Sequence, residues 1–390
     1  MQFSNISWRC SSDLLSFVIF ALRLEVTVLR FRDYGFRVGY LPTGTLNAIT
    51  DVQGVRVGQV SWITDGDVVH RTGVTVIWPH AGNPFRDRVF AGTWILNGYG
   101  IMTGRAVIEE WGVLGAPIVL CNTRSIGLGY EASVQFMSDL DREVGDLDVL
   151  MPIVAECDDG FLNDNRGSAT PVEVFAQALR EANTGPIAEG AVGAGTGTQL
   201  FSFKGGIGTS SRVVRVYGKN YTVGILVNTN FGSRHQLQVQ GVPLGQMIAD
   251  FMPAYEKEGS CIGVLATDAP LMPSQLKRLA KRIGLGLVRT GSVGNDGSGE
   301  LFIAFSTAQT VPREAGATSN MEYIATGQFW TQGAPIDSLF DATVEAAEEA
   351  VLNALVQSHT TVGRDGHVLT QFPVERGVDF IRDYRRRTDL

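Results

Sequence analysis

Short apolar runs alternate with amphipathic stretches along most of the chain. Continuous runs of apolar and β-branched residues predict buried strands, and apolar positions that recur every three to four residues predict helices. The predicted strands are residues 72–78, 116–120, 149–155, 261–266 and 301–305, and the predicted helices are residues 102–111, 132–141, 274–283 and 335–356. Strands that alternate with helices in this way indicate an α/β fold.

One pair of predicted strands departs from this alternation. Residues 213–217 and 221–227 flank a Gly-Lys-Asn turn at residues 218–220, which predicts an antiparallel hairpin. A hairpin beside strand–helix alternation favours a layered α/β fold over a purely parallel sheet. No internal repeat or proline-rich linker interrupts the pattern, so we expect residues 31–390 to form one globular domain.

A further helix is predicted to start near residue 170. Thr170 can cap the free N–H groups of the first turn, Pro171 suits the first helical position, and Glu173 completes a capping box. The apolar side chains that follow share one face of this helix.

Composition and charge narrow the function classes. Apolar residues make up 44% and charged residues 18% of the chain, against roughly 25% charged in an average soluble protein. This excludes a disordered chain, which needs low hydrophobicity and high net charge. The net charge is −8 and no basic stripe is present, so nucleic acid is not expected as a partner. Glycine is in excess at 46 of 390 residues, but without the Gly-X-Y period of collagen.

The cysteines and the N-terminus bear on localisation. The four cysteines lie far apart and show no zinc-binding spacing, so we expect reduced thiols and a cytoplasmic protein. Residues 14–22 form an apolar run that suits a signal-peptide core but is shorter than the ~20 residues of a membrane span. Charged residues border the run and no A-x-A-like cleavage site follows it. We therefore interpret residues 1–30 as an N-terminal extension, expect no membrane partner, and leave export open.

Two kinds of binding site can be tested against the sequence. The glycine-rich residues 190–208 contain neither G-x-G-x-x-G nor G-K-[ST], so they match no nucleotide-binding motif. We interpret them as backbone that needs positive φ or a close approach to another group. The five histidines form no H-E-x-x-H or other ligand pair, so no metal site is expected.

The Gly259–Ser260 pair stands directly before the apolar run 261–266. A glycine here lets the peptide adopt a strained geometry in which the Ser260 hydroxyl can attack the Gly259 carbonyl, cutting the chain and making Ser260 an N-terminus. The new α-amino group, with a pKa of about 7.7–8.0, can serve as general base for the hydroxyl, so no catalytic histidine is needed. A Gly-Ser pair before a strand is common, however, and taken alone it indicates only a turn.

Ordered blocks of residues resemble the self-processing serine aminopeptidases, a family that includes L-aminopeptidase/D-alanine esterase-amidases and β-peptidyl aminopeptidases. The resemblance runs from about residue 31 to the C-terminus, with blocks at residues 46–52, 54–58, 154–156, 159–164, 193–197, 204–212, 230–232, 259–260, 265–271 and 297–300. It implies an α/β fold, a four-layer αββα sandwich of the N-terminal-nucleophile type. It also implies self-cleavage after Gly259, into a larger chain (residues 31–259) and a smaller chain (residues 260–390).

The resemblance further implies a role for each matching residue. Ser260 is implied as the nucleophile, and Ser298 and Glu300 as the pair that orients its hydroxyl and amine. Asn230 is implied as the amide that stabilises the oxyanion, and Glu156 as the carboxylate that binds the free amino group of the substrate. The implied activity is hydrolysis of short peptides, amides or esters through an acyl-enzyme, without a cofactor. Because relatives assemble as oligomers of the cleaved heterodimer, we expect a homo-oligomer.

One position departs from the family pattern. At Asp158, relatives of the D-alanine esterase type carry a tyrosine that shares the oxyanion role. An ionised aspartate only accepts hydrogen bonds. Either Asn230 and backbone N–H groups suffice, or Asp158 helps to bind a cationic substrate beside Glu156, and the sequence leaves both open.

Two other functions also stay open. One is an N-acyltransferase that passes the acyl group to an amine, although the self-processing ornithine acetyltransferases use threonine rather than serine. The other is an uncleaved, non-catalytic binding protein on the same scaffold.

Overall fold

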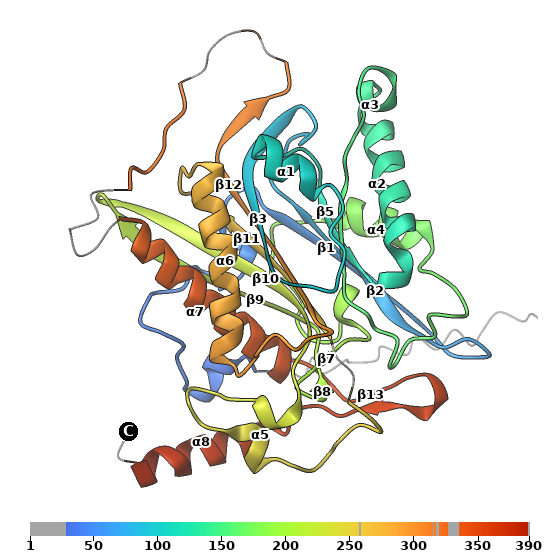
Figure 1. The fold of residues 1–390 in the computed structure, drawn as a ribbon, viewed down its shortest axis with the longest axis vertical. Coiled ribbons are helices and arrows are strands. Elements are labelled where there is room, and N and C mark those ends of the chain that lie inside the picture. Colours follow the sequence, from blue (N-terminus) through green and yellow to red (C-terminus); the bar gives the residue numbers. More distant parts are fainter. Residues whose placement is uncertain (1–28, 257–258, 315, 317–319, 327–334, 389–390) are drawn as a thin grey trace, which may run out of the picture.

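Two β-sheets lie face to face in the middle of the protein, and helices cover the outer face of each sheet (Figure 1). The computed structural model describes residues 29–256, 259–314, 316, 320–326 and 335–388. Within these residues, one sheet has the strand order β1 (Arg56–Thr64), β2 (His70–Trp78), β5 (Ile118–Cys121), β6 (Ile153–Glu156). The other has the order β4 (Val113–Leu114), β3 (Asp87–Gly98), β12 (Gly299–Pro312), β11 (Ser260–Thr267), β10 (Lys219–Asn230), β9 (Ile207–Val216).

The outer layers are two pairs of helices. Helices α2 (Ile126–Leu140) and α4 (Val172–Glu181) pack on the four-stranded sheet, and α6 (Pro273–Arg289) and α7 (Pro335–Val356) pack on the six-stranded sheet. The remaining α-helices and strands are α1 (Arg105–Trp111), α3 (Glu143–Asp146), α5 (Leu244–Met247), α8 (Val374–Thr388), β7 (Gln199–Leu200), β8 (Phe203–Lys204), β13 (Thr361–Val362) and β14 (Val368–Leu369).

Burial on both faces explains why the strand sequences are almost continuously apolar. In β11, the side chains of Ile262 and Val264 lie between the sheets, where they share a core with Leu120 of β5. Cys261 and Leu265 belong to the other core, beneath α6 and α7. A strand buried on both sides has no polar face. The predicted four-layer αββα sandwich is confirmed.

The sheets are mixed, as the hairpin suggested. The pairs β5–β6 and β11–β12 are parallel, while β10 pairs antiparallel with both β9 and β11. The hairpin between β9 and β10 turns through Tyr217 and Gly218, which have φ of 48° and 80°. Positive φ at both central residues matches the twist of paired strands. The turn is therefore shorter than predicted and starts one residue earlier.

The predicted capping box at Thr170 is wrong. Helix α4 starts at Val172, and Pro171 occupies the cap position without a side-chain hydrogen bond. The Thr170 hydroxyl is buried and accepts a hydrogen bond from Ser125 Oγ at 3.1 Å. The Thr170 side chain therefore bonds to Ser125 instead of capping the first turn of α4.

Other element boundaries differ where tertiary packing outweighs local propensity. Helix α2 begins at Ile126, before the predicted residue 132, and within it Gly129 packs against Phe175 and leaves no room for a side chain there. Strand β6 begins only at Ile153, because Val149 and Met151 upstream are exposed.

The N-terminal apolar run, residues 14–22, lies outside the described part of the chain. In the part that is described, none of the helices combines the length and the apolar character needed to cross a bilayer.

Candidate active site

The ends of three neighbouring strands, β10, β11 and β12, lie together at one end of the six-stranded sheet. Ser260, the first residue of β11, pairs with Asn230 at the end of β10 and with Gly299 at the start of β12. Residues directly opposite each other on neighbouring strands have adjacent side chains on the same face. The fold thus brings Asn230, Ser260 and the segment around Ser298 and Glu300 together, although up to 70 residues separate them in the sequence.

The second sheet supplies the opposite wall of a cavity of about 560 Å³. Ser260 lines it on one side, and Glu156 and Asp158, at and just after the end of β6, line it on the other. The complete lining is Tyr99, Thr123, Glu156, Asp158, Gly259, Ser260 and Gly297. Asn230, Ser298 and Glu300 are buried outside this lining. The volume lies within the range of sites for small ligands.

The Ser260 hydroxyl is buried yet has no hydrogen-bond partner among the described residues. Burial raises the pKa of the neighbouring Cys157 thiol, and a weak interaction with the Ser260 hydroxyl offsets part of that rise. An unpaired buried hydroxyl costs about 1–3 kcal/mol. A group left in this state at a cavity wall is available to a ligand.

Ser298 and Glu300 form a pair beside Ser260. Ser298 Oγ donates a hydrogen bond to Glu300 Oε1, while Glu300 Oε2 is buried without a partner in the part of the chain that the structure covers. Burial raises the pKa of Glu300, and the bond from Ser298 offsets part of that rise. The free carboxylate oxygen can accept a hydrogen bond from an amine or hydroxyl brought next to it.

The amide of Asn230 is held in one orientation. Its Oδ1 accepts a hydrogen bond from the backbone N–H of Gln199 at 3.1 Å. Because only Oδ1 can accept, this bond assigns the amide and leaves Nδ2 as the donor. Asn230 lies opposite Ser260 in the ladder, so a donor is available next to the unpaired hydroxyl.

Glu156 is a buried carboxylate whose oxygens are both bonded. Oε1 accepts the Ile101 N–H at 3.2 Å, and Oε2 accepts the Thr123 hydroxyl. Burial raises the pKa of Glu156, and the charge of Asp158 raises it further. A cation that enters the cavity would stabilise the ionised form of this carboxylate, which burial disfavours.

Asp158 acts as an acceptor in its local contacts. Its Oδ1 accepts the Gly160 N–H and Asn165 Nδ2, both at 3.1 Å. Neither contact makes the carboxylate a donor, so its arrangement differs from that of a tyrosine hydroxyl.

Gly259 is required by close contact rather than by left-handed backbone. It is not among the glycines with positive φ. A Cβ at this position would lie 1.5 Å from the carbonyl oxygen of Asn230. The Gly259 carbonyl itself accepts the Gly299 N–H at 3.1 Å. The lack of space beside the Asn230 carbonyl explains why residue 259 is a glycine, and the sequence pattern did not reveal this.

Two lining residues were not predicted from the sequence. Tyr99 and Thr123 belong to no motif, and only the facing of the two sheets places them at the cavity. Among the described residues, no cluster of histidine, cysteine or acidic side chains could hold a metal ion.

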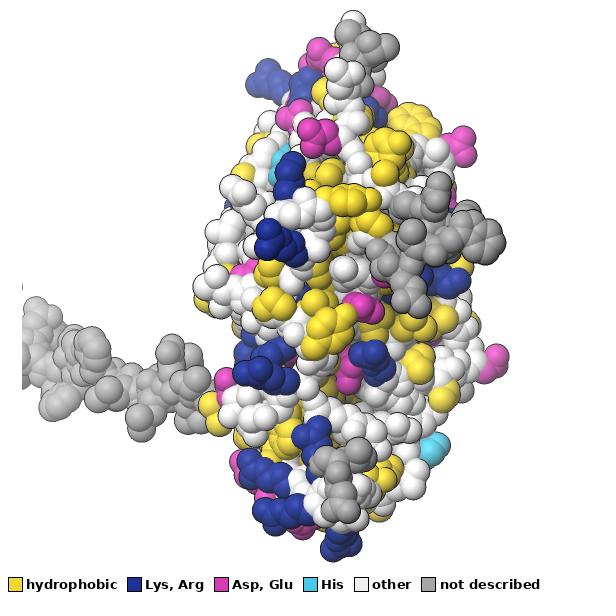
Figure 2. All heavy atoms as spheres, turned by 90° about the vertical axis from the view of Figure 1, so that its left-hand side faces the viewer, with side chains coloured by type: hydrophobic (Ala, Val, Ile, Leu, Met, Phe, Trp, Pro, Cys, Tyr) yellow, Lys and Arg dark blue, Asp and Glu magenta, His cyan; other side chains and the backbone are white. Residues whose placement is uncertain are grey.

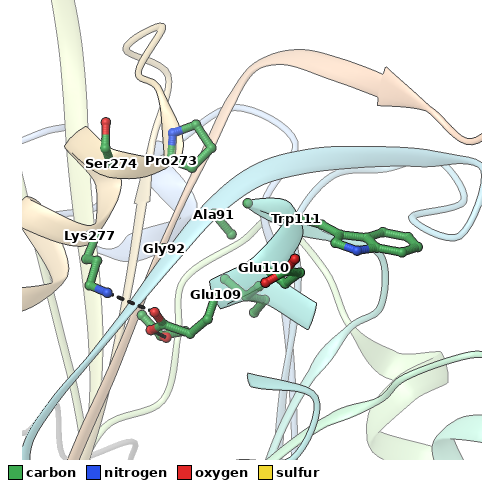
Figure 3. Close-up of a pocket in the computed structure, with 11 residues that line it drawn as sticks. Ala91, Gly92, Glu109, Glu110, Trp111, Pro273, Ser274 and Lys277 are labelled. Carbon is green, nitrogen blue, oxygen red and sulfur yellow. Dashed lines mark hydrogen bonds and ion pairs between the residues drawn. The ribbon is translucent and has the colours of Figure 1, made fainter. Parts of the chain in front are cut away.

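A second pocket, of about 330 Å³, lies between β3, α1 and the start of α6 and shares no lining residue with the first (Figure 3). Two of its charged groups pair with each other, since Lys277 Nζ donates to Glu109 at 2.8 Å, and the Thr93 hydroxyl donates to the same carboxylate. It offers no nucleophile comparable with Ser260.

Comparisons with known proteins agree with this geometry. Residues 47–369 match the model of peptidase family S58. The chain is 40% identical to a β-peptidyl aminopeptidase of Sphingosinicella microcystinivorans over 381 residues, covering 92% of this chain and 93% of the relative. It is also similar to the solved structure of a Burkholderia sp. β-aminopeptidase, with a TM-score of 0.84, 40% identity, and coverage of 91% of this chain and 99% of the other.

A third similarity bears on the fold type. The L-aminopeptidase D-Ala-esterase/amidase of Ochrobactrum anthropi has a TM-score of 0.85 and 39% identity, covering 92% of this chain and 99% of that one. Its structure is described as a variant of the Ntn hydrolase fold and as a prototype of the serine aminopeptidases. The predicted N-terminal-nucleophile-like architecture and the predicted family are both confirmed.

Proposed function

The chain belongs to peptidase family S58 and is an aminopeptidase, and from this premise we propose that it cuts itself between Gly259 and Ser260 and then uses Ser260 as an N-terminal nucleophile. The observation that carries the proposal is the buried, unpaired hydroxyl of Ser260 in the wall of the cavity. The two alternative functions, an acyltransferase and a non-catalytic binding protein, have no comparable observation in their favour.

Self-cleavage begins with attack of Ser260 Oγ on the carbonyl carbon of Gly259. The C–N bond breaks as the C–O bond forms, and the hydroxyl proton passes to the leaving nitrogen, which gives an ester and a free α-amino group. Water then hydrolyses the ester and leaves a carboxylate on Gly259. The hydrogen bond from the Gly299 N–H polarises the attacked carbonyl.

Hydrolysis of a substrate uses the amine that self-cleavage releases. The α-amino group of Ser260 takes the proton of its own hydroxyl as Oγ attacks the acyl carbon. Asn230 Nδ2 donates to the oxyanion that develops, and Ser298 with Glu300 Oε2 positions the amine and hydroxyl. The leaving amine or alcohol departs with a proton, and water releases the acyl group from the acyl-enzyme.

Glu156 selects substrates with a free amino group. A buried carboxylate whose pKa is raised gains stability when an ammonium pairs with it. Asp158 adds a second negative charge to the same wall. This arrangement favours removal of N-terminal residues from short peptides, amides or esters over cleavage within a chain.

The two cleaved chains are expected to stay together because the central sheet interleaves them. β11 and β12, from the smaller chain, lie between β10 and β3, from the larger chain. Separation would break ladders on both sides and expose the shared core.

Association of whole molecules is a further part of the proposal. Figure 2 shows apolar side chains gathered on the side of the molecule that lies at the left of Figure 1. Leu285 and Val288 of α6 are both more than half exposed. Exposed apolar surface of this kind supports a homo-oligomer.

A denaturing gel of the purified protein tests self-cleavage. The intact chain has a mass of 42.2 kDa, and scaling by length gives fragments of roughly 28 and 14 kDa. We expect these two bands to replace the intact band on incubation, and N-terminal sequencing of the smaller one to begin Ser-Cys-Ile. An active protein that stays intact would overturn the proposal.

A pH series tests the role of Glu156. Because its pKa is raised, the carboxylate loses its charge at a higher pH than an ordinary glutamate, so KM should rise on acidification from above pH 4.5. Glu156→Gln should lower kcat/KM at neutral pH by roughly 10²-fold, since losing one partner of a buried charge pair costs about 2–5 kcal/mol. KM of the variant should also lose this pH dependence.

The control is Glu143→Gln, at an ion pair with Arg86 away from the cavity. It should keep the wild-type profile. An unchanged KM profile in Glu156→Gln would show that another group binds the ammonium.

A further inference from the structure

The glycine-rich segment encloses a lysine that is completely buried. The Lys204 side chain is 0% exposed, and Nζ donates to the carbonyl oxygens of Gly195, Thr198 and Gly205 at 2.9, 2.7 and 2.6 Å. An ammonium has three N–H groups, and these contacts use all of them. Burial disfavours this charge and lowers the pKa of Lys204 to about 7, whereas the three carbonyl contacts favour the ammonium form. Lysine is almost never fully buried unless its charge is paired, so this position requires an explanation.

The glycines make this arrangement of carbonyls sterically feasible. A Cβ at Gly205 would lie 2.5 Å from the carbonyl carbon of Gln199, and a Cβ at Gly195 would lie 2.5 Å from the backbone nitrogen of Ile207. Larger residues would therefore push the carbonyls away from the ammonium. This accounts for part of the glycine-rich sequence that matched no nucleotide-binding motif.

One peptide group connects Lys204 to the catalytic amide. The Thr198 carbonyl, held by Lys204 at 2.7 Å, and the Gln199 N–H, which donates to Asn230 Oδ1 at 3.1 Å, belong to the same peptide bond. Because a peptide group is planar and trans, fixing its oxygen also fixes the direction of its N–H. A charged donor at the oxygen also polarises the group and strengthens hydrogen bonds along the chain.

We propose that Lys204 is a positioning residue for the oxyanion site, aiming Asn230 Nδ2 at the reacting carbonyl through the Thr198–Gln199 peptide group. This inference rests on the proposed function of Asn230 as oxyanion donor. Lys204 touches no substrate, since it does not line the cavity. Its effect should therefore appear in kcat rather than in KM.

A double-mutant cycle tests the proposal. Lys204→Met keeps the length of the side chain and removes its donors. We expect kcat, normalised to cleaved enzyme on a gel, to fall about 10–100-fold with KM nearly unchanged, because slight misplacement of a catalytic group can cost about 10²-fold. In an Asn230→Ala background, the same substitution should change kcat less than twofold. A purely structural role would lower kcat by the same factor in both backgrounds.

Two further variants keep the test interpretable. Ser358→Ala removes another hydrogen bond to the Gly205 carbonyl, at 2.7 Å, without touching the Thr198–Gln199 peptide, and should leave kcat unchanged. Lys204→Gln keeps an amide donor and should recover part of kcat; it also replaces Lys204→Met in the cycle if thermal unfolding shows that variant to be unstable.

The possible failures are distinguishable. A folded lysine variant with wild-type kcat, or equal losses in both backgrounds, would overturn the inference alone. If Asn230→Ala itself retained wild-type kcat, the oxyanion role in the proposed function would be wrong.

Discussion

A Ser260→Ala chain is expected to remain intact at 42.2 kDa and to hydrolyse no aminoacyl substrate. The substitution removes the hydroxyl that attacks both the Gly259 carbonyl and the substrate, so cleavage and turnover should be lost together. In serine hydrolases, removal of the nucleophile lowers kcat on the order of 10⁶-fold. A time course on a denaturing gel, combined with release of p-nitroaniline from aminoacyl anilides, measures both losses.

Ser274→Ala is the matched control for this experiment. Ser274 lines the second pocket, which shares no residue with the Ser260 cavity, so its variant should cleave itself and turn over substrate as the wild type does. Fragments from the Ser260→Ala chain would show that another group cuts the backbone. Adding an acceptor amine to the wild-type assay tests acyl transfer, since faster release of p-nitroaniline would indicate a transferase.

Asn230→Ala is expected to lower kcat by about 10²–10³-fold with little change in KM, because removing one oxyanion donor costs about 3–4 kcal/mol. The ground-state carbonyl carries less negative charge than the oxyanion, so the loss falls on the transition state. The Gln199 N–H loses its acceptor in this variant. Steady-state kinetics of the cleaved enzyme, with thermal unfolding to verify the fold, provide the measurement.

Asn220→Ala, at the exposed opposite end of β10, is the control and should retain wild-type kcat. A kcat of Asn230→Ala within a few-fold of wild type would mean that backbone N–H groups stabilise the oxyanion.

The fold was predictable to the extent that local periodicity reflects burial. The run 261–266 and the amphipathic helix 335–356 have their expected types in β11 and α7. Prediction failed where a distant contact outweighed the local signal, as at Thr170, whose hydroxyl bonds to Ser125 instead of capping α4. It also failed at Val149, which is apolar but exposed.

The residues of the site also fall into those that the sequence could predict and those that it could not. The family resemblance implied roles for Ser260, Ser298, Glu300, Asn230 and Glu156, and their proximity supports the roles proposed here. Tyr99 and Thr123 could not be found from the sequence, because they reach the cavity only through the packing of one sheet on the other.

The sequence by itself determined the type of several elements, among them β11 and α7, because periodicity is a local property, whereas strands such as β1 and β3 were not predicted. Together with the family resemblance, it also located the Gly259–Ser260 bond as the candidate for cleavage. Only the tertiary structure decided why residue 259 has no side chain, since the obstacle is the carbonyl of Asn230 on the neighbouring strand. Only the tertiary structure also connected Lys204 to Asn230. Both depend on pairing between strands far apart in the chain, which local patterns do not encode.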